Sequence, residues 1–162
     1  TAFVAGAVVG IFQDTIDKIV LLAMFLPVLA GQSGNTGAQA LAVLIREMTQ
    51  GDLGPRVKAQ LIKESILGVV HGFMVGCICA IVMYVIASSQ GNPHVITLSI
   101  IILFSMTVSC LVSGLMGAII PVTLKKLGAD PAAGSSIILT TGTDVVSMGV
   151  MLFLANKFIL GA

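Results

Sequence analysis

Asp144 is the residue of this sequence whose chemistry is hardest to reconcile with a purely structural role. It lies in the run Ile137–Ala155, which contains no other charged residue and is long enough to cross a bilayer. A carboxylate in the middle of a membrane costs roughly 2.5–3.5 kcal/mol on insertion scales unless it faces water, a cation or a polar partner. Asp144 therefore marks a candidate functional site.

Three roles for Asp144 follow from this position. It could hydrogen-bond to a neighbouring helix as a packing residue, it could exchange a proton, or it could bind a cation. No Lys or Arg lies in the middle of the other predicted membrane segments to form an ion pair with it. The polar residues elsewhere in the apolar runs decide which role is favoured.

The second group of polar residues is the glycine-rich stretch Gly31–Gly37, which interrupts an apolar segment. We predict that the helix breaks here, because unwound backbone inside a membrane frees carbonyl groups that can bind cations. Asn35 and Gln39 add neutral oxygen ligands. One carboxylate with neutral oxygens suits Mg²⁺, Ca²⁺ or Mn²⁺ rather than soft metals, with water or a second chain completing the coordination.

Membrane helices must hold these groups in place. The chain is 57% hydrophobic and only 9% charged, whereas soluble domains carry about 25% charged residues. We expect an all-α polytopic membrane protein, cut from a longer protein and forming one domain over residues 1–162. About five transmembrane segments are predicted, the first truncated and the second broken at the glycines: Thr1–Phe12, Ile19–Met48, Ser65–Ser88, Val95–Leu124 and Ala132–Leu160.

Small residues recur at four-residue spacing in these segments, which predicts close helix packing in lipid. Gly68, Gly72 and Gly76 form such a stripe in the third segment, and similar stripes run along the first and fourth. The three cysteines, all in apolar runs, are expected to be packing residues. His71 lies seven residues after Glu64 on the same helix face, and a structural contact between the two is expected.

Basic residues predict the orientation. Six of them flank the loops after the second and fourth segments, and two lie on the other side. Cytoplasmic loops carry the excess of Lys and Arg, so the amino end is expected in the cytoplasm of a cell-membrane protein and Ala162 outside. The residues on the expected cytoplasmic side are Arg46, Arg56, Lys58, Lys63, Lys125 and Lys126, and those on the other are Lys18 and Lys157.

Several of these motifs occur together, and in the same order, in a known family. They are Pro27–Gln39, the stretch from Arg46 to Leu53, Lys63-Glu64, the stretch from Pro121 to Pro131, and Thr143–Val145. Over nearly its whole length the sequence resembles the transmembrane domain of MgtE-type magnesium channels. Its most specific parts are the Gly-Asn-x-Gly-x-Gln element and the aspartate of the last helix.

The resemblance implies a homodimer whose second and fifth helices line one central pore. It implies a Mg²⁺ site built by Asp144, with the backbone carbonyl of Thr140 one turn earlier. The family often has a second Asn where this chain has Ala38, so Asn35 or water is expected to substitute there. The cytoplasmic Mg²⁺-sensing domains of the family are absent from this sequence.

We therefore expect a passive Mg²⁺ channel and not an enzyme. Its pore would bind hydrated Mg²⁺ between two symmetry-related carboxylates, with a candidate metal set of Asp144, Thr140, Asn35, Gly37 and Gln39. The first alternative is a secondary transporter that exchanges a divalent cation for H⁺ or Na⁺. The second is a structural subunit that transports nothing, which leaves the charge of Asp144 unexplained.

Overall fold

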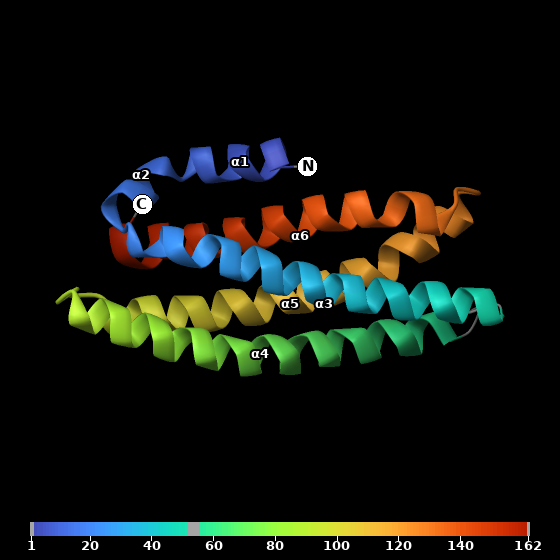
Figure 1. Ribbon diagram of the computed structural model, residues 1–162, viewed down its shortest axis with the longest axis horizontal. Helices are drawn as coiled ribbons and strands as arrows, with labels where there is room; N and C mark the ends of the chain where they lie inside the picture. Colours follow the sequence, from blue (N-terminus) through green and yellow to red (C-terminus); the bar gives the residue numbers. More distant parts are fainter. Residues whose placement is uncertain (1, 52–55, 162) are drawn as a thin grey trace.

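The computed structural model describes residues 2–51 and 56–161, and in these residues the chain is helical. Figure 1 shows the helices as one bundle with their long axes roughly aligned. The elements are α1 (Ala2–Ile11), α2 (Gln13–Lys18), α3 (Leu21–Gln50), α4 (Val57–Ser89), α5 (Val95–Lys126), α6 (Pro131–Ala155) and a π-helical turn η2 (Asn156–Leu160).

α5 is the central helix of the bundle. It packs extensively against α4, α3 and α6, while α3 and α6 also contact each other and α1 lies along α6 (Figure 1). Within residues 2–51 and 56–161, three helical stretches are long and apolar enough to cross a membrane, namely Val57–Ser89, Val95–Lys126 and Gly134–Leu160. The prediction of an all-α, multi-pass membrane protein with about five helices is confirmed.

The predicted break in the second membrane segment is wrong. α3 continues without interruption through Gly31–Gly37 and includes Pro27. A continuous helix pairs its backbone groups internally, which hydrocarbon cannot do for an unwound segment. Two side chains on this stretch also bond back to the preceding turn, with Ser33 Oγ donating to the carbonyl of Ala30 at 3.1 Å and Thr36 Oγ1 to that of Gln32 at 3.0 Å.

The glycines of α4 let its backbone approach that of α5, as the sequence predicts. A Cβ added at Gly68 would lie 2.6 Å from the carbonyl oxygen of Cys110, and one added at Gly72 would lie 2.8 Å from Cys110 Cβ. At Gly76 the nearest atoms, from Leu103, lie 3.0 Å away. Only a residue without a side chain fits at this crossing.

The carboxyl end of α3 and the α5–α6 connection lie at the same end of the bundle. One cavity there is lined by residues from the end of α3, such as Thr49, by Lys125 of α5 and by Asp130 of the connection. Asp130 caps α6 by accepting a hydrogen bond from the Ala132 N–H at 2.9 Å, and Pro131 occupies the first helical turn.

Replacement of Gly72 by leucine tests the α4–α5 crossing. We expect Gly72→Leu to lower the yield of folded protein sharply, since the added side chain would overlap the backbone of α5, and overpacking costs about 1–3 kcal/mol or more. Gly134→Ala is the control, because a Cβ there meets only Leu124 Cδ1 at 3.5 Å. Size-exclusion profiles and thermal unfolding in detergent give the comparison, and equal yields for both variants would contradict the assignment.

Candidate cation site

Asp144 lies near the middle of α6 and is half-buried. Within the described residues, the one side-chain hydrogen bond that reaches it is from Ser147 Oγ to its backbone carbonyl, at 3.1 Å. One turn before it, Thr140 is exposed and donates its hydroxyl to the carbonyl of Ser136 at 2.9 Å. Ser136, Thr140 and Asp144 thus form a polar stripe along one side of the helix.

α3 runs antiparallel to α6, and the contacts between them fix which residues share a level. A Cβ at Gly34 would lie 4.0 Å from Thr143 Oγ1, and one at Gly37 would lie 3.0 Å from Leu139 Cδ1. Asn35 follows Gly34 and Asp144 follows Thr143, so the two lie at similar depth. Thr143 and Leu139 are buried, whereas Asn35 is exposed.

The exposed face of α3 at this level is small and polar. Gly31, Asn35, Ala38 and Gln39 are all exposed there. The outer face of α4 is instead a dense apolar surface, including Phe73, Met74 and Ile78. Hydrocarbon suits the second kind of surface and not the first, so the α3 face is suited to water or to another polypeptide.

Gly37 has a different position from the other predicted ligands. It is buried, and its carbonyl oxygen lies directly where a side chain at Gly117 of α5 would be. The carbonyl is also part of a continuous helix instead of an unwound turn. The expected role of Gly37 as a metal ligand does not fit this placement, which makes it a packing residue between α3 and α5.

The protein brings Asp144, Thr140 and Asn35 to one level but does not surround an ion with protein carboxylates. Among residues 2–51 and 56–161, no group of three or more His, Cys, Asp or Glu side chains is close enough to hold a metal. A cation at Asp144 would need further oxygens from water, neutral side chains or a second chain.

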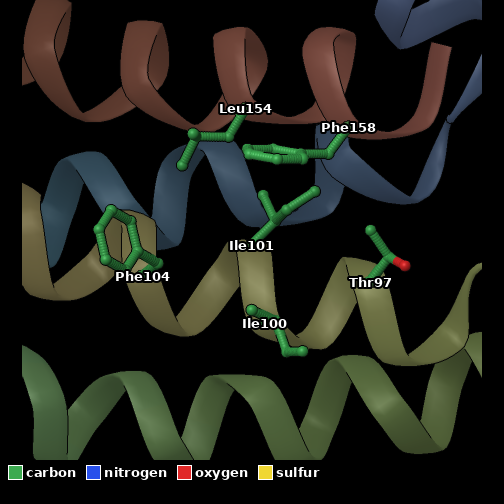
Figure 2. A pocket seen from close by; sticks show the side chains of 6 residues that line it. All are labelled: Thr97, Ile100, Ile101, Phe104, Leu154 and Phe158. Carbon is green, nitrogen blue, oxygen red and sulfur yellow. The ribbon is translucent and has the colours of Figure 1, made fainter. Parts of the chain in front are cut away.

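A separate cavity of about 440 Å³ lies between α5 and the end of α6. Figure 2 shows its lining, which consists of Thr97, Ile100, Ile101, Phe104, Leu154 and Phe158. Only Thr97 among these side chains carries a polar atom, and none carries charge. This cavity offers a cation no ligand set, in contrast to the surface beside Asp144.

The expected contact between His71 and Glu64 is replaced by a different network. His71 Nε2 lies 3.0 Å from Gln32 Nε2, and its Nδ1 lies 3.2 Å from Thr36 Oγ1, so both ring nitrogens face α3. Glu64 instead accepts a hydrogen bond from Gln60 at 3.0 Å. The sequence analysis missed Gln32 and Thr36, although two polar residues four apart in an apolar helix indicate a shared polar contact.

Comparison with known proteins identifies the family. The profile of the MgtE family, described as a divalent cation transporter, matches residues 26–154. The chain belongs to the MgtE family. Three MgtE proteins, each called a magnesium transporter, align over 94–96% of this chain: those of Bacillus subtilis and Enterococcus faecalis, each 29% identical, and that of Thermus thermophilus, 28% identical.

The chain spans about one third of the length of these MgtE proteins, with 34%, 33% and 33% of each covered. The family match includes both helices that carry the candidate site, since α3 and α6 fall largely within residues 26–154.

Cysteine labelling can test whether the exposed residues Asn35 of α3 and Thr140 of α6 are accessible to water. With Cys77, Cys79 and Cys110 replaced by Ala, we expect Asn35→Cys and Thr140→Cys to react with a membrane-impermeant thiol reagent in liposomes opened to both sides. Two matched variants should stay unlabelled, Thr143→Cys because the site is buried and Met74→Cys because it faces lipid. Mass spectrometry measures the modified fraction. Equal labelling at Asn35→Cys and Met74→Cys would contradict a water-filled face.

Proposed function

We propose that this MgtE-family chain conducts Mg²⁺ passively through a pore formed by two copies of itself, with Asp144 as the main ion ligand. The observation that supports this most directly is the position of Asp144. It is a half-buried carboxylate in the middle of an otherwise uncharged membrane helix, level with the exposed Asn35 of α3. The relatives named as magnesium transporters support Mg²⁺ as the ion.

A symmetric pair of carboxylates explains how such a site would select a dication. Two Asp144 side chains facing each other repel when the site is empty, and a divalent ion relieves that repulsion more than a monovalent ion does. Mg²⁺ gives up its water slowly, so the site binds it with its hydration shell largely intact. The carboxylates then contact the ion through its waters, which keeps passage possible.

Neutral groups complete this hydrated site. The Thr140 carbonyl lies one turn before Asp144, and the Asn35 amide is exposed at the same depth. The Asn35 amide oxygen can accept hydrogen bonds from the waters around the ion, whereas the Thr140 carbonyl already accepts one from Thr143 Oγ1 at 3.1 Å and would share its oxygen with them. Ala38 contributes no polar atom, so water fills the volume beside it in this proposal. Gln39 instead lines a cavity between α3 and α4 together with Glu64 and His71.

A second copy of the chain supplies the other half of the pore. The small polar face of α3 must be shielded from lipid. A symmetry-related copy of the chain shields it and encloses water along the symmetry axis. The basic end of the bundle is the cytoplasmic end in this proposal, with the amino end also cytoplasmic. Regulatory domains of the full-length protein would lie on that side, outside this single transmembrane domain.

Removal of the Asp144 charge tests the ion site. We expect Asp144→Asn to lose most Mg²⁺-dependent thermal stabilisation, which for wild type reaches about 2.7 kcal/mol at a hundredfold excess over Kd. Mg²⁺ flux should fall, and monovalent leak should rise because the dication no longer competes. Asp144→Glu keeps the charge but moves it by one methylene, so it should impair selectivity more than folding.

Asp130→Asn is the matched control for this experiment. It removes one carboxylate from the start of the same helix while keeping a good N-cap, so Mg²⁺ binding and flux should remain at wild-type level. Full stabilisation and flux in Asp144→Asn would exclude Asp144 as the site. Mg²⁺ flux that depends on an imposed pH or Na⁺ gradient in liposomes would indicate a coupled transporter and contradict a passive channel.

The oligomeric state tests the shared pore. We expect a dimer in mild detergent, because an isolated chain would expose the Gly31–Gln39 face of α3 to lipid. Native mass spectrometry and light scattering measure the mass of the protein particle. A chain that is monomeric at all concentrations and still conducts Mg²⁺ would contradict a pore between two copies.

A further inference from the structure

His71 makes a polar connection from α4 to the middle of α3, at the level of the proposed ion site. Its two ring nitrogens lie 3.0 Å from Gln32 Nε2 and 3.2 Å from Thr36 Oγ1. The Thr36 hydroxyl in turn donates to the Gln32 carbonyl at 3.0 Å and faces Cys110 Sγ of α5 at 3.5 Å. Three helices therefore meet in one hydrogen-bonded group.

One tautomer of the neutral ring satisfies every member of this group. Because the Thr36 hydroxyl donates to the Gln32 carbonyl, the His71 Nδ1–H donates to Thr36 Oγ1. The Nε2 atom then accepts from the Gln32 amide. The orientation of the ring is thus fixed by two bonds to α3, and α3 in turn is fixed relative to α4.

This stretch of α3 packs closely against α5 and α6 but has little packing against α4. Six of the eleven residues from Ala30 to Ala40 are glycine or alanine. Contacts between α3 and α4 are much sparser than those between α4 and α5. Polar side-chain bonds therefore carry a larger share of the α3–α4 interaction here than apolar packing does.

Gln32 and Thr36, which bond to His71, each directly follow a residue of the exposed face of α3. Gln32 follows Gly31, and Thr36 follows Asn35, while Gly31 and Asn35 belong to the exposed face of α3. A shift of Gln32 or Thr36 therefore moves Asn35 relative to Asp144. A hydrated-ion site requires a fixed distance between such groups, because a displacement near 1 Å is enough to spoil its geometry.

We propose that His71 is a positioning residue for the ion site, acting through Gln32 and Thr36 to fix the place of Asn35. The role rests on the proposed function, since it presumes that a cation binds at Asp144. His71 itself contacts no ion in this arrangement. Its loss weakens Mg²⁺ binding and discrimination against monovalent ions because the α3 half of the site becomes loose.

The test compares three variants by Mg²⁺-dependent thermal stabilisation and by the Mg²⁺ to Na⁺ flux ratio in liposomes. His71→Phe keeps a ring of similar size and removes both bonds. We expect it to raise the Mg²⁺ concentration at half-maximal stabilisation by about threefold to tenfold, the effect of one or two interhelical hydrogen bonds. His71→Gln, whose amide nitrogen can take the place of Nε2, should recover part of that loss.

Met83→Ala is the control for a merely structural effect. Met83 is a fully buried core residue further along α4, so this variant should lower the melting temperature without shifting the Mg²⁺ midpoint or the flux ratio. The proposal is overturned if His71→Phe shifts the midpoint no more than Met83→Ala does. If His71→Phe does not fold, an unshifted midpoint and flux ratio in His71→Gln overturn it equally.

Asp144→Asn, measured alongside, separates the two proposals. A wild-type response to Mg²⁺ that persists in Asp144→Asn rejects the ion site, and the role of His71 with it. A response that depends on Asp144 but is unchanged by the His71 variants rejects the positioning role alone.

Discussion

Hydrocarbon cannot form hydrogen bonds with the protein, and this constraint determines both the course of α3 and the meaning of Asp144. Backbone groups inside a bilayer must pair with each other, so α3 stays helical through three glycines that would favour a turn in water. The charge of a carboxylate side chain, in contrast, is not satisfied by the backbone hydrogen bonds of its own helix. Asp144 has no ion-pair partner in its own helix, and its charge must be met by water, a cation or a second chain.

The other helices pack closely around α5, and this packing positions the residues of the candidate site. Glycine and serine on the facing helices let backbones approach, as at Gly68 against Cys110 and at Gly37 against Gly117. Three serines of α5, Ser105, Ser109 and Ser113, are fully buried within the bundle. Because α3 and α6 contact each other and both lie against α5, Asn35 and Asp144 come to similar depth in the bundle. The packing residues thus position the site without contributing a ligand.

The sequence correctly predicted the structural features that follow from patterns within one segment. Apolar length predicts the spans, and four-residue spacing predicts the Gly68–Gly76 crossing. The predicted helix break at Gly31–Gly37 is wrong because two tendencies compete there. The low helix propensity of glycine favours a break, but the membrane penalises unpaired backbone groups more strongly. The prediction for His71 is also wrong, because spacing along one helix suggested Glu64, whereas the partners Gln32 and Thr36 lie on another. Sequence spacing does not show which helix faces which.

Three successive residues of α3 have three different surroundings. Asn35 is exposed at the depth of Asp144, Thr36 faces His71, and Gly37 lies against α5. Because successive residues of a helix are separated by about 100° around its axis, three neighbours can serve an ion, a polar contact and a packing contact in turn. If Asp144 binds the ion as proposed, a substitution in this stretch is expected to affect both the affinity and the position of the site. Measurements of flux alone cannot separate these effects, whereas the Mg²⁺ midpoint and the melting temperature report them independently. The stretch is thus one structural unit, in which the placement of Asn35 depends on Thr36 and Gly37, two residues that face other helices and not the proposed ion site.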